Sequence, residues 1–161
     1  MRIKFTYKTK EGTDSVTGEF LSESKEECIK QFKDVHPECI ELISAENAKI
    51  YEIKSNQVTW SIRIEILEDQ SRSHIRAMVE FWTDWEYRLA SNDGDYTITF
   101  LQFIARDIFK LIINEDLSLN QLRKYFDDAE GYCPINGSYG IDIVDFDDYE
   151  IEAADFDVVD F

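Results

Sequence analysis

The segment from Asp95 to Asn114 constrains the fold of this chain more than any other. It reads DYTITFLQFIARDIFKLIIN, and apolar residues occupy nearly every side of the helix that it predicts. Such a helix must be buried on most of its surface, so other elements have to pack around it. Arg106, Asp107 and Lys110 would each cost about 2.5–3.5 kcal/mol at the centre of a bilayer. We therefore interpret the segment as a buried helix and not as a membrane span.

The residues before this helix alternate between strand and helix patterns. Residues 1–45 are typical of a ββαβ unit, whose helix begins at the capping box Ser24–Glu27, stops at His36-Pro37 and is followed by a strand at Cys39–Ile43. Further strands are expected at Ile50–Ile53 and Val58–Leu67, and two short strands at Ile141–Ile143 and Tyr149–Ala153. Helices are expected at Ser73–Leu89 and from the N-cap Ser118 to Gly131. The prediction is an α+β fold, with a mixed or antiparallel sheet packed against about three main helices.

The same reading divides the chain into three parts. Residues 1–47 form the ββαβ unit, which is too short to be stable alone and is expected to be integral to the fold. Residues 48–144 form an α+β core. Residues 145–161 form an acidic, aromatic C-terminal segment, in which Asp155–Phe161 is either a further strand or a short linear motif.

Charge is distributed unevenly along the chain. The formal net charge is −17, of which residues 1–50 carry −2, residues 51–114 carry −3 and residues 115–161 carry −12. Nucleic acid and anionic membranes would be repelled by such a chain, whereas a basic protein surface would be attracted. The acids therefore point to protein binding, with no direct contact to nucleic acid or membrane.

The acids of the C-terminal third are the candidate binding residues. Carboxylates at the end of the last helix oppose the helix macrodipole, and residues placed at a cost to stability often serve function. The predicted partner-binding set, with two aromatic anchors, is Asp127, Asp128, Glu130, Asp142, Asp145, Asp147, Asp148, Glu150, Glu152, Asp155, Phe156, Asp157, Asp160 and Phe161. The extended tail alone has about one charge per 7 Å, against one per about 1.7 Å of duplex DNA. Mimicry of DNA would require the folded surface to add acids such as Glu115 and Asp116.

Catalytic and metal sites are weakly indicated. Cys28, His36, Cys39 and Cys133 are too scattered for a typical zinc site, and the acids of Asp145–Glu150 lack the glycine and distal glutamate of a calcium loop. Cys133 with a histidine base is an alternative, and Glu80 with Asp84 could form a carboxylate pair. An i,i+4 ladder through Arg72, Arg76, Glu80, Asp84 and Arg88 explains that pair as ion pairing. No enzyme activity, metal or cofactor is expected.

The thiols and the N-terminus indicate the compartment. Three cysteines without paired spacing are typical of reduced thiols, and the start MRIKFTYKTKEG has no apolar signal region. A cytoplasmic protein is expected.

Several short motifs resemble those of a family of uncharacterised small proteins that phages and prophages encode. The resemblance spans roughly residues 57–145 and rests on Phe81-Trp82, Glu86, Arg88-Leu89, Gly94-Asp95, Ala129-Glu130-Gly131-Tyr132 and Gly140-Ile141. It implies an origin in a mobile element, and it implies no catalytic residues.

These observations lead to a functional hypothesis. The expected function is a non-catalytic inhibitor that binds a basic, nucleic-acid-binding host protein, such as a defence nuclease, in an anti-defence or nucleic-acid-mimic role. The alternatives are an immunity protein against a basic toxin nuclease, a structural, oligomer-forming phage protein, and a cysteine- or metal-dependent enzyme. The partner's identity and the oligomeric state stay open.

Overall fold

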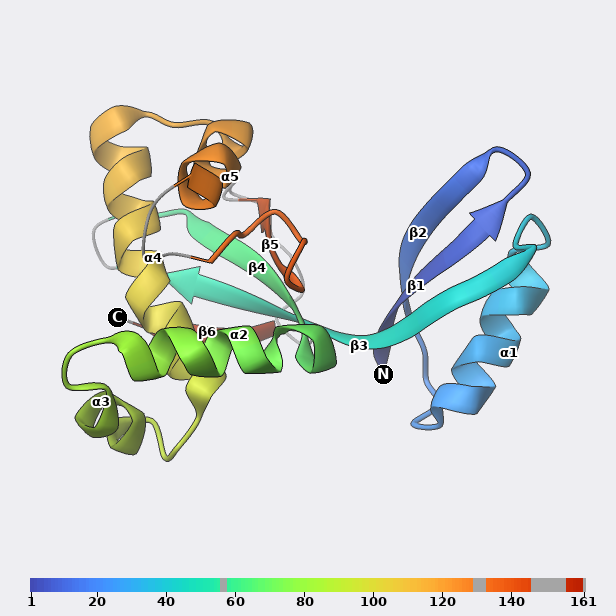
Figure 1. Ribbon diagram of the computed structural model, residues 1–161, viewed down its shortest axis with the longest axis horizontal. Coiled ribbons are helices and arrows are strands. Elements are labelled where there is room, and N and C mark those ends of the chain that lie inside the picture. Colours follow the sequence, from blue (N-terminus) through green and yellow to red (C-terminus); the bar gives the residue numbers. More distant parts are fainter. Residues whose placement is uncertain (56–57, 129–132, 146–155, 161) are drawn as a thin grey trace. The chain divides into compact units, whose positions relative to one another are not determined.

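The computed structural model describes residues 1–55, 58–128, 133–145 and 156–160. The chain folds into two compact units, one of Met1–Lys49 with Leu67–Asp69 and one of Ile50–Ile66 with Gln70–Phe161. Helices and sheet strands both occur in the described residues, so the predicted α+β class is confirmed (Figure 1). The two units are described in turn.

The first unit is a small sheet covered on one face by a helix. Its elements are β1 (Arg2–Thr9), β2 (Gly12–Glu19), α1 (Lys25–Val35) and the first part of β3 (Glu41–Lys54). Strand β1 lies in the middle and pairs antiparallel with both neighbours. Alternate residues of β1 point to the helix, where the rings of Phe5 and Phe32 stack with centroids 4.2 Å apart. This unit thus has a core of its own.

The second unit contains a mixed sheet. The end of β3 neighbours β4 (Ser61–Leu67), which pairs antiparallel with β5 (Ile141–Asp145). On the other side of β3, the strand β6 (Phe156–Asp160) pairs in parallel with residues 50–54. The sheet order in this unit is therefore β6-β3-β4-β5, with β5 at one edge.

The helices of this unit pack around its longest member. They are α2 (Glu68–Phe81), which belongs to this unit from Gln70 onward, α3 (Trp85–Ser91), α4 (Tyr96–Glu115) and α5 (Leu119–Asp128). Helix α4 begins at the N-cap Asp95, as its pattern predicts, and it packs in one core cluster with the isoleucines of β4. None of the helices in the described residues is long and apolar enough to cross a membrane.

One predicted helix, Ser73–Leu89, was wrong because the chain turns a corner inside it. Helix α2 ends at Phe81, and Asp84 adopts a left-handed backbone with φ of 61° before α3 begins. The ring of Trp82 lies against Phe103 of α4, with centroids 3.6 Å apart. This tertiary contact holds Trp82 in the core, and the spacing of apolar residues gave no sign of it. The predicted ladder of ion pairs is interrupted at the same place.

Two predicted strand boundaries were also wrong. The strands expected at Cys39–Ile43 and Ile50–Ile53 belong to one continuous strand, β3, of 14 residues. Conversely, β4 begins at Ser61 and not at Val58. Just before it, Trp60 stacks on Phe109 of α4 at 5.1 Å, so Trp60 packs on the helix without being part of the strand.

Candidate functional site

The exposed carboxylates of Glu115, Asp116 and Asp127 lie at the two ends of helix α5. Glu115 and Asp116 precede it at the end of α4, and Asp127 lies in its last turn, followed by Asp128 in the same turn. A helix of 10 residues is about 15 Å long, so the two groups of acids are separated by about that distance. We refer to the exposed side chains of Glu115, Asp116 and Asp127 as the α5 acidic surface.

The local sequence explains how this surface is built. Ser118 and Gln121 form a capping box, in which Ser118 Oγ accepts from the Gln121 N–H at 3.3 Å and Gln121 Oε1 accepts from the Ser118 N–H at 2.8 Å. Leu122 and Phe126 then bury one side of the helix completely. The opposite side is left to solvent, and no base lies in the last turn of α4 or α5. The negative end of α5 therefore adds to the field of Asp127.

Helix α5 also carries an exposed aromatic side chain, which the sequence did not lead us to expect. Tyr125 lies two residues before Asp127 and is 43% exposed. The signal was present, since Tyr125 falls outside the spacing of Leu119, Leu122 and Phe126 that marks the buried side of α5. Exposed tyrosines are frequent anchors of protein interfaces because they offer both apolar area and a hydroxyl.

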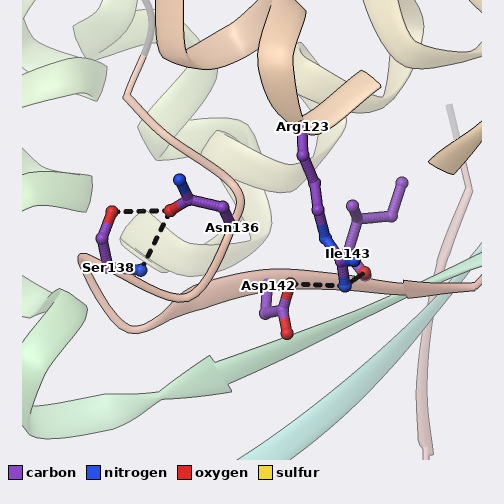
Figure 2. A network of polar contacts seen from close by, with 5 residues as sticks. All are labelled: Arg123, Asn136, Ser138, Asp142 and Ile143. Atoms are coloured by element: carbon purple, nitrogen blue, oxygen red, sulfur yellow. Dashed lines mark hydrogen bonds and ion pairs between the residues drawn. The ribbon is translucent and has the colours of Figure 1, made fainter. Parts of the chain in front are cut away.

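Asp142 has a different environment, because Arg123 of α5 compensates its charge. One guanidinium nitrogen, Arg123 Nη2, donates to Asp142 Oδ1 at 3.1 Å and to the backbone oxygen of Ile143 at 2.9 Å (Figure 2). The two side chains of the ion pair are only 30% and 27% exposed. Arg123 therefore fixes α5 to the edge strand β5, a role that no sequence pattern indicated.

The same edge strand is closed along its outer side by the preceding turn. Ile143 N–H donates to the oxygen of Ile135 at 2.9 Å, and Gly137 N–H donates to the oxygen of Ile141 at 2.8 Å. Asn136 Oδ1 accepts from both the N–H and the hydroxyl of Ser138, which holds the turn in shape (Figure 2). The Ile143 N–H and the backbone oxygens of Ile141 and Ile143, which would otherwise invite another strand, are thus occupied within the chain.

Charged residues of β4 lie beside β5. Arg63 is 1% exposed and Glu65 is 8% exposed, so both are buried although they alternate with the isoleucines of the core. In the strand register Arg63 lies opposite Asp145 and Glu65 lies opposite Asp142. Two of the predicted binding positions thus lie in a strand with buried charges next to it.

The remaining predicted residues fall in or beyond β6. Phe156, Asp157 and Asp160 belong to this strand. The segment Asp155–Phe161 was expected to be either a further strand or a short linear motif, and the backbone of residues 156–160 forms a strand. Their register partners in β3 are Ile50, Tyr51 and Lys54. Glu130, Asp147, Asp148, Glu150, Glu152, Asp155 and Phe161 lie outside the described residues, as do the strand expected at Tyr149–Ala153 and most of the calcium-like stretch.

The groups weighed for catalysis lie in unreactive surroundings. Burial raises the pKa of the Cys133 thiol to about 11, so the thiolate needed for nucleophilic attack is disfavoured. Glu80 accepts from Arg76 Nε and from the Tyr96 hydroxyl, both at 3.0 Å, and these two hydrogen bonds, that from Arg76 first, lower its pKa. Asp84 lies beyond the corner that ends α2, so it does not share a helical face with Glu80.

The histidines are held by neighbours within the fold. His36 Nδ1 lies 2.7 Å from Glu38 Oε1, and its ring stacks on Phe32. His74 stacks on Tyr139 with ring centroids 4.2 Å apart. Within the described ranges no three His, Cys, Asp or Glu side chains are grouped as metal ligands.

Comparison with known proteins identifies the family. Residues 61–161 match a family described as "Protein of unknown function (DUF2528)". The chain belongs to this family. Two curated relatives are protein ea10 of Escherichia phage lambda and the lambda prophage-derived protein ea10 of Escherichia coli O6:H1 (strain CFT073). Each is 33% identical over 93 residues, which cover 54% of this chain and 75% of the relative.

The predicted resemblance to an uncharacterised phage and prophage family is therefore confirmed. No solved structure matches the chain. The family match begins at the start of β4, so the first unit of the structure lies almost entirely outside it. The α5 acidic surface, the Arg123 ion pair and β6 all lie inside the match.

Proposed function

We propose that this protein is a non-catalytic inhibitor that binds a basic, nucleic-acid-binding protein of a bacterial host through the α5 acidic surface. The observation that carries the proposal is the concentration of acid in the family-matched part. Residues 61–161 contain 23 acids and 8 bases, a net charge of −15 out of −17. The same charge is the reason for the proposed compartment and the proposed kind of target. A phage-family protein with this surface would meet basic nucleic-acid-binding proteins in the cytoplasm.

The geometry adds two supporting points. One of the two bases in residues 115–161, Arg123, is engaged with Asp142 inside the fold, so it does not offset the exposed acids. Tyr125 of the same helix is exposed and supplies an apolar anchor. Carboxylates would steer and orient a basic partner, and the aromatic side chain would be desolvated at the contact.

The absence of catalysis is part of the proposal. It is supported by the buried Cys133 thiol, by the engagement of Glu80 with Arg76 and Tyr96, and by the corner that separates Glu80 from Asp84. In this proposal the family-matched residues 61–161 act by covering the surface of the target and form no covalent bond with it.

A capture experiment with charge-matched variants tests the proposal. The test variant carries Glu115→Gln, Asp116→Asn and Asp127→Asn. The control carries Glu11→Gln, Glu23→Gln and Asp34→Asn, which are also exposed acids and belong to the first unit. Each variant loses three negative charges. We expect wild type and control to retain the same basic protein from a bacterial lysate and to release it when duplex DNA is added as a competitor. The test variant should retain much less.

Equal capture by all three proteins, or capture that DNA does not compete, contradicts the proposal. The same surface would serve against a basic toxin nuclease, so the identity of the captured protein decides between a host target and a toxin. Inhibition of DNA binding by the purified target then measures the activity directly.

A further inference from the structure

We propose that β2, the edge strand of the first unit, is a self-association surface that pairs with β2 of a second copy of this chain. This inference is independent of the proposed function, because β2 belongs to the part of the chain outside the family match. It rests on the open backbone of β2, on the small net charge of the first unit and on the side chains that the pairing would bring together.

The backbone groups of β2 alternate between β1 and solvent. Just after the strand, the Phe20 N–H donates to the Met1 oxygen and the Met1 amino group donates to the Phe20 oxygen, both at 2.8 Å. Because such pairs recur at every second residue of an antiparallel ladder, the backbone groups of the even-numbered positions of β2 are directed to β1. Ser15 N–H correspondingly bonds to Asp14 Oδ1 at 2.9 Å and not to β1. Antiparallel pairing therefore directs the N–H and C=O groups of Thr13, Ser15 and Thr17 outward; we call these groups the β2 edge.

The edge strands β5 and β2 are treated differently by the sequence. At β5, Arg123 and the turn through Ile135 and Gly137 occupy the outward backbone groups. At β2, residues 12–15 are exposed, and the strand GTDSVTGE contains no lysine or proline, the usual residues that prevent edge-to-edge pairing. An open edge of this kind is a template for strand addition.

The small net charge of the first unit favours a second copy of this chain as the partner of the β2 edge. The first unit has 8 bases and 12 acids, a net charge of only −4, and the Glu19 carboxylate of β2 is already paired with Arg2 at 2.8 Å. The second unit carries −13, which would repel an identical surface. The first unit is thus the part of the chain that can meet its own copy with little electrostatic cost.

The side chains of β2 suit antiparallel pairing about a two-fold axis at Ser15. In that register Ser15 lies opposite Ser15 of the second copy and Thr13 lies opposite Thr17, which are favourable cross-strand pairs. Asp14 lies opposite Val16, so no two acids oppose each other at the centre. The Ser15 N–H exchanges its bond to Asp14 for one across the interface. One strand pair buries less area than a standard interface of about 1,600 Å², so we expect weak dimers.

Sedimentation analysis over a hundredfold range of concentration tests the inference with the full chain. The dimer fraction should rise with protein concentration and with salt, because salt screens the repulsion between two chains of charge −17. Ser15→Pro removes an outward N–H without removing a bond to β1, and it should weaken dimerisation at least tenfold. The matched control Ser15→Ala keeps the N–H and should dimerise like wild type.

A second pair of variants tests the register and does not depend on proline. Thr13→Lys with Thr17→Lys places lysine opposite lysine across the two-fold axis and should abolish dimers. Thr13→Lys with Thr17→Glu places lysine opposite glutamate and should restore them. Wild type that stays monomeric at high salt and at the highest concentration overturns the inference. So does equal dimerisation of the two double variants. Neither result affects the α5 acidic surface, whose binding weakens with salt.

Discussion

The two units of this protein contain nearly the same number of bases but very different numbers of acids. The first unit (Met1–Lys49 with Leu67–Asp69) has 8 bases and 12 acids, and the second unit (Ile50–Ile66 with Gln70–Phe161) has 9 bases and 22 acids. The first unit shows that such a core can form with a small net charge, so the surplus of acids in the second unit is not a requirement of folding. It raises the repulsion within the folded state. This surplus is the reason for our proposal that the second unit binds a basic partner.

The largest expected effect comes from a change in the core of one unit, because the two units have separate cores. Phe32→Ala removes a ring that is 3% exposed and stacked on Phe5, and it should destabilise the first unit by about 3–5 kcal/mol. Hydrogen exchange should then rise in β1, β2 and α1 while the amides of α4 keep their protection, because the two core clusters share no residue. Phe81→Ala, at a ring 76% exposed, is the control and should change neither region. Loss of protection in α4 on replacing Phe32 would show that the two units fold as one.

The ion pair of Arg123 gives the next largest effect. Arg123→Ala leaves the Asp142 carboxylate and the Ile143 oxygen without their donor, and hydrogen bonds to charged groups contribute about 1.5–3 kcal/mol. The melting temperature should fall by about 2–4 °C for each kcal/mol lost.

Lys124→Ala is the matched control for this change. It removes the same charge from the neighbouring, exposed position and should leave the free energy of unfolding within about 0.5 kcal/mol of wild type. Equal destabilisation by the two variants would mean that net charge, and not the closure of β5, sets the stability.

A smaller effect is expected from acid, and each unit has a carboxyl group that reports it. Hydrogen bonding from His36 lowers the pKa of Glu38, and hydrogen bonding from Arg76 and then Tyr96 lowers the pKa of Glu80. A lowered pKa stabilises the fold above the ordinary value of 4.5, and this contribution is lost as the pH falls through the lower, folded value. Glu38→Gln should therefore flatten the acid limb of unfolding in the first unit and Glu80→Gln in the second. A steeper limb in either variant would reverse the assigned direction of the shift.

The smallest effect is expected from replacing Glu80 and Asp84, the two carboxylates that could have formed a catalytic pair. Glu80→Gln together with Asp84→Asn should leave partner capture unchanged, because Glu80 is engaged with Arg76 and Tyr96 and Asp84 lies beyond the corner. Asparagine tolerates the left-handed backbone of Asp84, so the corner should persist. A folded double variant that no longer captures the partner would place these carboxylates in the functional surface.

Local patterns were sufficient to predict some elements. The predicted capping residues Ser24 and Ser118 accept the expected backbone hydrogen bonds, because a cap depends on residues within one turn. The corner at Asp84 was missed because Trp82 and Trp85 fit one helical stripe, and only the contact of Trp82 with Phe103 breaks it. Arg63 was missed as a buried residue because alternation along a strand does not reveal what covers each face.

The candidate surface was predictable in composition and not in geometry. The acids of the last third could be counted, but the compensation of Asp142 depends on Arg123, which lies 19 residues earlier in the chain. Tyr125 could have been found by its place outside the apolar stripe of α5. Exposure of Glu115 and Asp116 followed from the end of α4, which the sequence located within one residue.

The association rate of the captured basic protein, measured at several salt concentrations, tests the central claim most directly. The three proteins to compare are wild type, the triple variant of the α5 acidic surface and the charge-matched triple variant of the first unit. We predict that the first of these triple variants slows association several-fold at low salt and flattens its salt dependence, while the control retains the rate and slope of wild type. Equal slowing by both would mean that net charge alone attracts the partner, and it would contradict an acidic recognition surface on α5.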